Sequence, residues 1–314
     1  GDQLMEDLKD PRKTLGEALV AAAEKNKHIV AISADSSSGS GLTPFYERFP
    51  ERHIEFGIME QGVIGFAAGL ATTGKIPFAV AIAPFVTARP FEMFRNDLGY
   101  MRQNVKVVGR CAGITYSDLG ATHQSLDDIA IIRTIPGVTV LNPGDPIDIV
   151  KAVHAAAAHV GPVYIKLGSP KMPVLMDENY PFQIGKGVVM QEGNDVTIIG
   201  TGTVLCKAAA AARILKEKGI QPRLINMHTI KPLDRELVLK AASETGKIVT
   251  VEESYLAGGL GSCIAEFLAT EHPVPMKMIG IDDLFCDTGP YEELLAMYGL
   301  QGDKIAETVV QFLG

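Results

Sequence analysis

One stretch of this 314-residue chain constrains its fold more than any other: residues 53–71, with the sequence HIEFGIMEQGVIGFAAGLA. The alternating run His53–Phe56 predicts the end of a β-strand, and Gly57 breaks it. Glu60 then stands at the start of a long apolar segment, which predicts a helix. Small residues in that segment are three or four positions apart, so they share one helical face that another backbone can approach closely. They are Gly62, Gly65, Ala68 and Gly69.

Glu60 has two possible roles at this stage. A carboxylate at a helix start is stabilised by the partial positive charge of the helix N-terminus, and this is the ordinary role of an isolated glutamate. Alternatively, a carboxylate shielded by apolar neighbours has a raised pKa and can exchange a proton with a bound ligand. The sequence motifs in the rest of the chain decide between these roles.

Length and composition indicate a two-domain α/β protein. A chain of 314 residues is long enough for about two domains. Its 32 glycines, its absence of tryptophan and its 46% hydrophobic content suit sheets that are buried on both faces by Ala-rich helices. Apolar strands alternate with helical patterns along the chain. We expect a first domain over residues 1–172, a proline-containing linker over 173–186, and a second domain over 187–314, each a mainly parallel sheet flanked by helices.

Charge and cysteine spacing exclude several classes of protein. The net charge of −8 favours neither nucleic acid nor an anionic membrane. We find no apolar run of membrane-spanning length and no signal peptide, and we expect Met5 to be the natural start. The cysteines are widely spaced without a C-x-x-C pair, so we expect no metal site, no disulfide framework and a cytoplasmic location. They are Cys111, Cys206, Cys263 and Cys286.

Further candidate residues follow predicted strands. Asp35 and a Ser/Gly run come after the apolar strand Ile29–Ser33, where ligands bind in open parallel sheets. The plain alternative for this segment is a flexible surface loop. Phe85 and Phe91 follow another apolar strand, and either could equally be a core aromatic. His123 lies in a loop that ends at an acidic helix start, where a histidine can be structural or can donate to a ligand.

Taken together, these motifs resemble one family. Glu60-Gln-Gly before an Ala/Gly-rich helix, and Gly120-Ala-Thr-His-Gln, are closely similar to the pyrimidine-binding domain of thiamine diphosphate enzymes in the transketolase and deoxyxylulose phosphate synthase group. The order of elements after residue 187 resembles the C-terminal domain of the same enzymes. The resemblance covers roughly Pro11–Gly314. It implies a thiamine-diphosphate-dependent transfer of a two-carbon ketol unit between sugar phosphates.

The resemblance also implies roles for single residues. Glu60 would bond N1′ of the cofactor's aminopyrimidine and favour its imino tautomer. Phe85, or in second place Phe91, would stack on that ring. His123 would contact the sugar and donate to its C1 hydroxyl or to the developing oxyanion. The remaining candidates are Asp35 for the cofactor, and Arg12, Asp118 and Lys171 for the sugar phosphate.

Three departures from the family pattern limit this assignment. An arginine that holds the substrate phosphate is usual where this chain has Ser169, and Lys166 or Lys171 would replace its bidentate contact with a point charge. The segment between Asp118 and His123 is one residue longer than in the family pattern. The Gly-Asp-Gly motif of the diphosphate site is absent, so we expect the Mg²⁺ ligands on a partner subunit and an α2β2 assembly that contains a homodimer of this chain.

Other functions stay open on the sequence. A 2-oxo acid dehydrogenase β subunit has a similar size and also lacks Gly-Asp-Gly. Against this alternative, the motif Thr122-His-Gln-Ser-Leu-Asp-Asp128 is typical of the enzymes that act on sugars. Half of a deoxyxylulose phosphate synthase is a further alternative. A non-catalytic assembly subunit is the fourth, but a scaffold would need neither Glu60, nor Phe85, nor His123.

Overall fold

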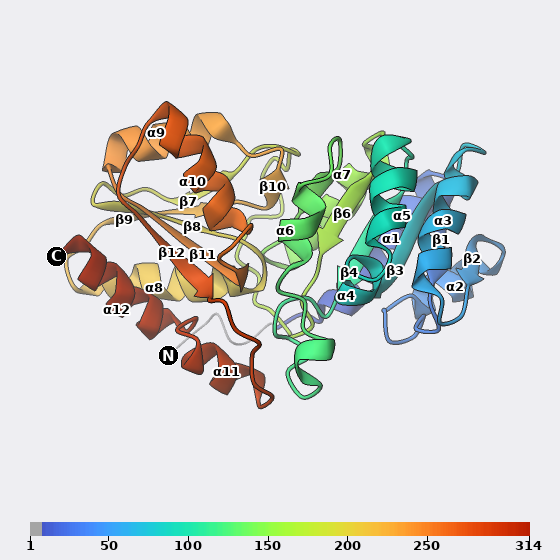
Figure 1. Cartoon of the computed structure of the whole chain (residues 1–314), viewed down its shortest axis with the longest axis horizontal. Coiled ribbons are helices and arrows are strands. Elements are labelled where there is room, and N and C mark those ends of the chain that lie inside the picture. Colours follow the sequence, from blue (N-terminus) through green and yellow to red (C-terminus); the bar gives the residue numbers. More distant parts are fainter. Residues whose placement is uncertain (1–7) are drawn as a thin grey trace.

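The computed structural model describes residues 8–314, so the proposed start at Met5 lies outside the described residues. Two α/β lobes lie side by side (Figure 1), each built on its own sheet. The two mainly parallel sheets confirm the predicted fold class. Where the domains divide stays a prediction, because β10 (Thr229–Lys231), from the part assigned to the second domain, pairs with a strand of the first sheet. No helix within residues 8–314 is long and apolar enough to cross a membrane.

The first sheet has seven strands in the described part of the chain. Besides β10 these are β1 (Ile29–Ser33), β2 (His53–Glu55), β3 (Ile76–Ile82), β4 (Lys106–Arg110), β5 (Thr139–Leu141) and β6 (Val163–Lys166). Their spatial order is β10-β5-β6-β4-β3-β1-β2, and only β10 is antiparallel to its neighbour. The carboxyl ends of the parallel strands therefore meet at one edge, which is where ligands bind in such sheets.

The second sheet has five strands in the order β12-β11-β8-β9-β7. They are β7 (Val188–Gln191), β8 (Val196–Gly200), β9 (Pro222–Asn226), β11 (Ile248–Tyr255) and β12 (Met276–Ile281). β7 pairs antiparallel with β9, and the other pairs are parallel.

Helices cover both faces of each sheet (Figure 1). In the first lobe they are α1 (Pro11–Lys25), α2 (Thr43–Arg48), α3 (Glu60–Ala71), α4 (Ala83–Val86), α5 (Phe91–Met93), the π-helix Phe94–Tyr100, α6 (Asp128–Arg133) and α7 (Pro146–Ala158). In the second lobe they are α8 (Leu205–Glu217), α9 (Arg235–Thr245), α10 (Leu260–Glu271), α11 (Tyr291–Met297) and α12 (Gly302–Leu313). Short 3₁₀ turns lie at Pro50–Arg52, Gly120–Thr122 and Gly202–Val204.

Local sequence explains where several helices begin. α1 starts at Pro11 after Asp10, whose side chain accepts a hydrogen bond from the Arg12 amide at 2.9 Å. α7 starts at Pro146 in the same way, because Asp145 accepts from the Asp148 amide at 2.7 Å. An acidic N-cap followed by proline satisfies an amide that has no partner inside the helix.

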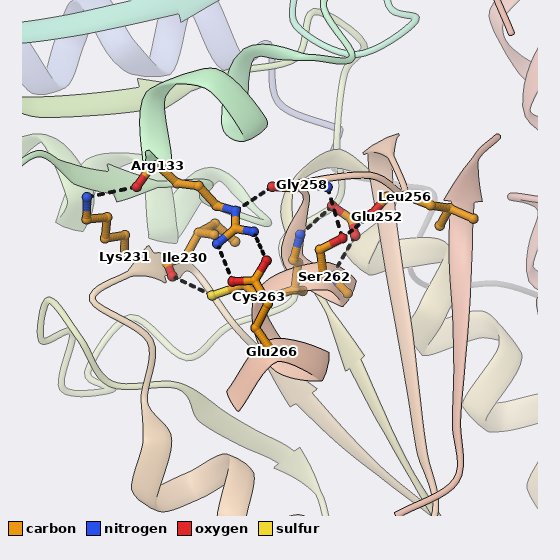
Figure 2. A network of polar contacts seen from close by, with 11 residues as sticks. Arg133, Ile230, Lys231, Glu252, Leu256, Gly258, Ser262, Cys263 and Glu266 are labelled. Atoms are coloured by element: carbon orange, nitrogen blue, oxygen red, sulfur yellow. Dashed lines mark hydrogen bonds and ion pairs between the residues drawn. The ribbon is translucent and has the colours of Figure 1, made fainter. Parts of the chain in front are cut away.

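The hydrophobic core is continuous across the two lobes. One cluster joins α3 and α6 of the first lobe to α9 and α10 of the second, through buried residues such as Val63, Ile129, Val238 and Ile264. Polar contacts cross the same junction (Figure 2): Arg133 donates to the Gly258 carbonyl at 2.6 Å and also pairs with Glu266. The burial of apolar surface between the lobes fixes their relative position more strongly than this ion pair, whose Glu266 end is exposed.

The linker is fixed by His228, whose ring stacks on Phe182 with centroids 4.0 Å apart. Burial lowers the pKa of His228 to about 4, against a smaller opposing effect of Asp234. The folded protein therefore holds this ring neutral, whereas the unfolded chain protonates it near pH 6.5. The resulting stability is present above pH 6.5 and is lost as the pH falls towards 4.

We expect acidification from pH 7 to 4.5 to destabilise the wild-type chain by about 2–3 kcal/mol more than His228→Gln, since only in the wild type does unfolding release a neutral buried ring that is then protonated. Urea unfolding at both pH values measures the difference. His28→Gln, at an exposed histidine, is the control and should follow the wild type. Equal losses in the wild type and His228→Gln would contradict the assignment.

Candidate active site

Glu60 is the first residue of α3 and lies, almost fully buried, close to the carboxyl edge of the first sheet. One carboxylate oxygen accepts a hydrogen bond from Arg89 Nη1 at 2.9 Å. The Arg89 side chain remains 40% exposed, and its guanidinium lies over the Phe85 ring, 4.0 Å from the centroid. A planar cation thus lies between a buried carboxylate and an aromatic face, and this stacking is favourable for guanidinium groups.

His123 joins this group from the loop between β4 and α6. The centroid of its ring lies 5.2 Å from that of Phe85 and 5.6 Å from that of Tyr116, and the ring is edge-on to both. Thr122 Oγ1 lies 2.9 Å from His123 Nδ1, which leaves Nε2 for a ligand. Glu60, Phe85 and His123, which the sequence predicts for one site, are therefore linked by a chain of direct contacts through Arg89.

The ends of β1 and β2 form a second polar group beside this site. Asp35 has a left-handed backbone (φ 51°), and its amide donates to Glu55 Oε1 at 2.5 Å. Hydroxyls of Ser33 and Ser37 donate to the other Glu55 oxygen. Burial alone would raise the pKa of Glu55, but these hydrogen bonds outweigh it and lower that pKa. The carboxylate of Asp35 itself is exposed at the strand end.

The other predicted site residues lie at varying distances from this group. Arg12 is held by Asp10, whose carboxylate accepts from its guanidinium at 3.1 Å. Asp118 is exposed on the loop of His123. Phe91 packs against the first core, and Lys171 lines a separate pocket between the linker and the second lobe. No contact within residues 8–314 brings Phe91 or Lys171 to Glu60.

Arg110 is a candidate that the sequence analysis missed. It ends β4 and is 5% exposed, with Nε bonded to Ser40 Oγ at 2.8 Å and Nη1 at 3.1 Å from Cys111 Sγ. Ser169 Oγ donates to the same sulfur at 2.8 Å. No acidic side chain among residues 8–314 pairs with this buried cation. A buried charge without a counter-charge is costly, so the geometry favours an anion from outside the chain.

The glycine-rich turn at Gly258–Ser262 is occupied by the chain itself. The buried Glu252 carboxylate accepts hydrogen bonds from the amides of Leu260 and Gly261, at the N-terminus of α10 (Figure 2). Burial raises the pKa of Glu252 to about 7, and these two bonds oppose the shift. A phosphate would have to displace this internal carboxylate, so the turn is structural. In the described part of the chain, no cluster of three or more His, Cys, Asp and Glu side chains could hold a metal ion.

Comparison with known proteins decides the family. The family described as Transketolase, pyrimidine binding domain, matches residues 9–173, and Transketolase, C-terminal domain, matches residues 185–305. The chain belongs to the transketolase family. Membership of this family implies dependence on thiamine diphosphate.

Several similar proteins are themselves single subunits of transketolases. The chain is 40% identical to one subunit of the apulose-4-phosphate transketolase of Phocaeicola vulgatus, over 96% of this chain and 97% of that protein. It is also 40% identical to one subunit of the 6-deoxy-6-sulfo-D-fructose transketolase of Clostridium sp., over 94% and 91% of the two chains. A solved structure described as a split gene transketolase, inactive beta4 tetramer, matches with a TM-score of 0.91 and 40% identity, covering 97% of this chain and 98% of that one.

Proposed function

We propose that this chain is the pyrimidine-binding, C-terminal subunit of a two-subunit transketolase, which transfers a two-carbon ketol unit between sugar phosphates. The observation that carries this proposal is the direct chain of contacts from Glu60 through Arg89 and Phe85 to His123. Bound thiamine diphosphate would supply the nucleophilic carbon that accepts and passes on the two-carbon unit.

The site fits the pyrimidine ring of this cofactor. Arg89 places a flat, hydrogen-bonding group against Glu60 and Phe85, and a flat heteroaromatic ring with a nitrogen facing Glu60 would use the same two contacts. Because the Arg89 side chain is 40% exposed, it can turn towards solvent and leave this place. Glu60 would then hold a proton at the ring nitrogen, with its burial excluding water from that bond. Asp35 would contact the cofactor from the end of β1.

His123 would act on the sugar. Its contact with Phe85 places it beside the ring on which the pyrimidine would stack, and Thr122 restricts its orientation. From there it would donate a hydrogen bond to a hydroxyl or developing oxyanion of the substrate. Asp118 on the same loop would accept a hydrogen bond from a further hydroxyl group of the substrate.

The anionic end of the substrate would be held by Arg110 and Arg12. The two relatives act on apulose 4-phosphate and 6-deoxy-6-sulfo-D-fructose, as their names state, and both names describe sugars with an anionic group. Arg110 lies next to Ser169, where the phosphate arginine is missing, because both side chains contact Cys111 Sγ. Arg12, at the start of α1, would add a second cation. Lys171, which lines another pocket, would then have no part in this contact.

Arg110→Met should raise the KM for an anionic sugar substrate by about 10–100-fold, because a charge-assisted hydrogen bond contributes about 1.5–3 kcal/mol. Initial rates of the assembled enzyme over a range of substrate concentrations measure this change. Arg95→Met, at an exposed surface arginine, serves as the control. An unchanged KM in Arg110→Met, with the fold intact by circular dichroism, would rule out this role.

A partner subunit would complete the site. Apolar side chains beside Glu60 are exposed, with Ile58 at 75% and Met59 at 59%, and Phe66 on α3 is also exposed. Such a patch marks an interaction surface. We infer that it is covered in an α2β2 assembly by a second copy of this chain and by an N-terminal subunit that carries the Mg²⁺ ligands. The inactivity stated for the beta4 tetramer of the related protein agrees with this requirement. The four thiols form no disulfide, which suits a cytoplasmic enzyme.

The proposal is tested by a ketol-transfer assay. The chain is coexpressed with the candidate N-terminal subunit and assayed with thiamine diphosphate, Mg²⁺, xylulose 5-phosphate and ribose 5-phosphate. Activity that requires both subunits supports the proposal. Cofactor binding without ketol transfer from any sugar phosphate would favour a 2-oxo acid or deoxyxylulose-type donor instead. Absence of cofactor binding in the assembled pair would favour a non-catalytic subunit.

A further inference from the structure

The loop that carries His123, residues 111–127, belongs to the first lobe in sequence but is packed into the second. Ile114 and Leu126, near its two ends, are buried in the same cluster as Ile198 and Leu224 of the second sheet. Between these two anchors lie the exposed residues of the loop, including Asp118. The position of His123 therefore depends on the second lobe, which supplies none of the predicted catalytic residues.

Glu253 of β11 makes the central contact at the base of this loop. Gly113 and Ser125 exchange backbone hydrogen bonds that close the loop, both at 2.9 Å. The next amide, Ile114 N–H, donates to Glu253 Oε1 at 2.7 Å in a buried position. Gly113 has φ +71°, and a Cβ there would lie 2.3 Å from the same oxygen. Glycine is thus required for the carboxylate to approach the loop base this closely.

Other bonds from the second lobe hold the remainder of the loop. The Tyr255 amide donates to the Leu126 carbonyl at 2.9 Å, and Gln124 Nε2 donates to the Asp287 carbonyl at 3.1 Å. The Gly289 amide donates to the Ser117 carbonyl at 3.1 Å. These bonds lie on both sides of His123 along the chain, so they limit the movement of the loop that carries it.

We propose that Glu253 is a positioning residue of the active site, which fixes His123 relative to Phe85 by holding the Ile114 amide. This inference rests on the proposed function for its catalytic consequence. Glu253 bonds to none of the residues that we propose to contact the cofactor or the substrate, so its effect on the site passes through the loop. Its second oxygen accepts from the Tyr291 hydroxyl at 2.8 Å, which fixes the orientation of the carboxyl group.

The neighbouring residue provides a matched control. Glu252 is buried to the same degree on the same strand, and both carboxyl groups have a pKa raised by burial to about 7. The Glu252 oxygens bond to α10 instead of the loop (Figure 2). Alanine at either position removes two hydrogen bonds from the second lobe, but only Glu253→Ala releases Ile114.

The first test does not depend on activity. Hydrogen exchange of peptides covering residues 111–127 is compared in the full chain of the wild type, Glu253→Ala and Glu252→Ala. We expect the Ile114 region to exchange at least tenfold faster in Glu253→Ala and within about twofold of the wild type in Glu252→Ala, because one buried hydrogen bond contributes about 1–1.5 kcal/mol. Equal exchange of this loop in both variants would overturn the proposal.

The second test uses the assembled enzyme. Glu253→Ala should raise the KM for the sugar and lower kcat by about tenfold or more, since a displacement of about 1 Å can cost as much as 100-fold. Glu253→Gln should restore both constants to within about threefold, because its carbonyl can accept from Ile114 and its amide can donate to Tyr291. If Glu253→Ala does not fold, Glu253→Asp, which withdraws the carboxylate from Ile114, takes its place in both tests.

The outcomes separate this inference from the proposed function. Unchanged constants in Glu253→Ala, or the same loss of activity in Glu252→Ala at equal stability, would overturn the positioning role. If the wild-type assembly transfers no ketol unit, the proposed function fails, and the exchange experiment alone still decides whether Glu253 holds the loop.

Discussion

Replacing Glu60 with glutamine is expected to lower kcat of the assembled enzyme by about 10²–10⁴-fold, which is the usual contribution of a positioned acid–base group. Glutamine keeps the size of the side chain and can still accept the hydrogen bond from Arg89, so the fold should be retained. It cannot hold a proton in exchange with a ring nitrogen. The loss should therefore be in kcat, and steady-state rates at saturating substrate and cofactor measure it.

A surface pair of the same geometry is the control. Glu92 pairs with Arg95 at 2.9 Å, as Glu60 does with Arg89, but its side chain is 62% exposed. Glu92→Gln should leave kcat within about twofold of the wild type. A kcat for Glu60→Gln within about threefold of the wild type would show that Glu60 has only the role of a carboxylate at a helix start.

The sequence predicts much of the fold because most strands are continuous apolar runs. The predicted strand Ile29–Ser33 has the bounds that β1 has in the structure. Residues 227–234, with the sequence MHTIKPLD, have no strand pattern and predict a loop, but the structure has β10 within them, so this prediction is wrong for residues 229–231. The three residues of β10 become a strand only by pairing with β5, which lies about ninety residues earlier in the chain. Periodicity along a sequence carries no signal for such a distant partner.

The candidate site also contains residues that the sequence predicts and residues that only the structure reveals. Glu60, Phe85 and His123 stand in motifs of adjacent residues, so resemblance to a family could place them together. Arg89 and Arg110 can be recognised as site residues only from long-range contacts in the structure. Arg89 contacts Glu60, and Arg110 contacts Ser40. Glu253 is 139 residues from the amide that it holds. Contacts of this kind depend on how the two lobes pack, and one sequence does not encode that packing in any local pattern.

Replacing Asp128 with alanine is expected to lower the free energy of unfolding by about 3–5 kcal/mol, because it leaves a buried lysine without its counter-charge. Asp128 is fully buried at the start of α6. Its two oxygens accept from Lys166 Nζ at 2.7 Å and from the Tyr164 hydroxyl at 2.6 Å. Burial, followed by the neighbouring Asp128 charge, raises the pKa of Tyr164, so this phenol stays a donor. Urea unfolding monitored by circular dichroism measures the loss.

Two comparisons isolate the cause. Glu307→Ala removes an exposed partner of Lys304 and should cost below about 1 kcal/mol. The double variant Asp128→Leu with Lys166→Met removes both buried charges and should recover most of the stability lost in Asp128→Ala. A loss below about 1 kcal/mol in Asp128→Ala would mean that water reaches Lys166 and solvates it.

The same pair links stability to the site. Lys166 Nζ also donates to the Ser125 carbonyl at 3.2 Å and to Ser254 Oγ at 3.0 Å, so it joins the end of β6, the base of the His123 loop and β11 of the second lobe. The double variant should therefore be stable but impaired, with a raised KM and intact folding. A double variant with wild-type kinetics would assign the positioning of the loop to Glu253 alone, because the Lys166 contact to Ser125 would then be dispensable.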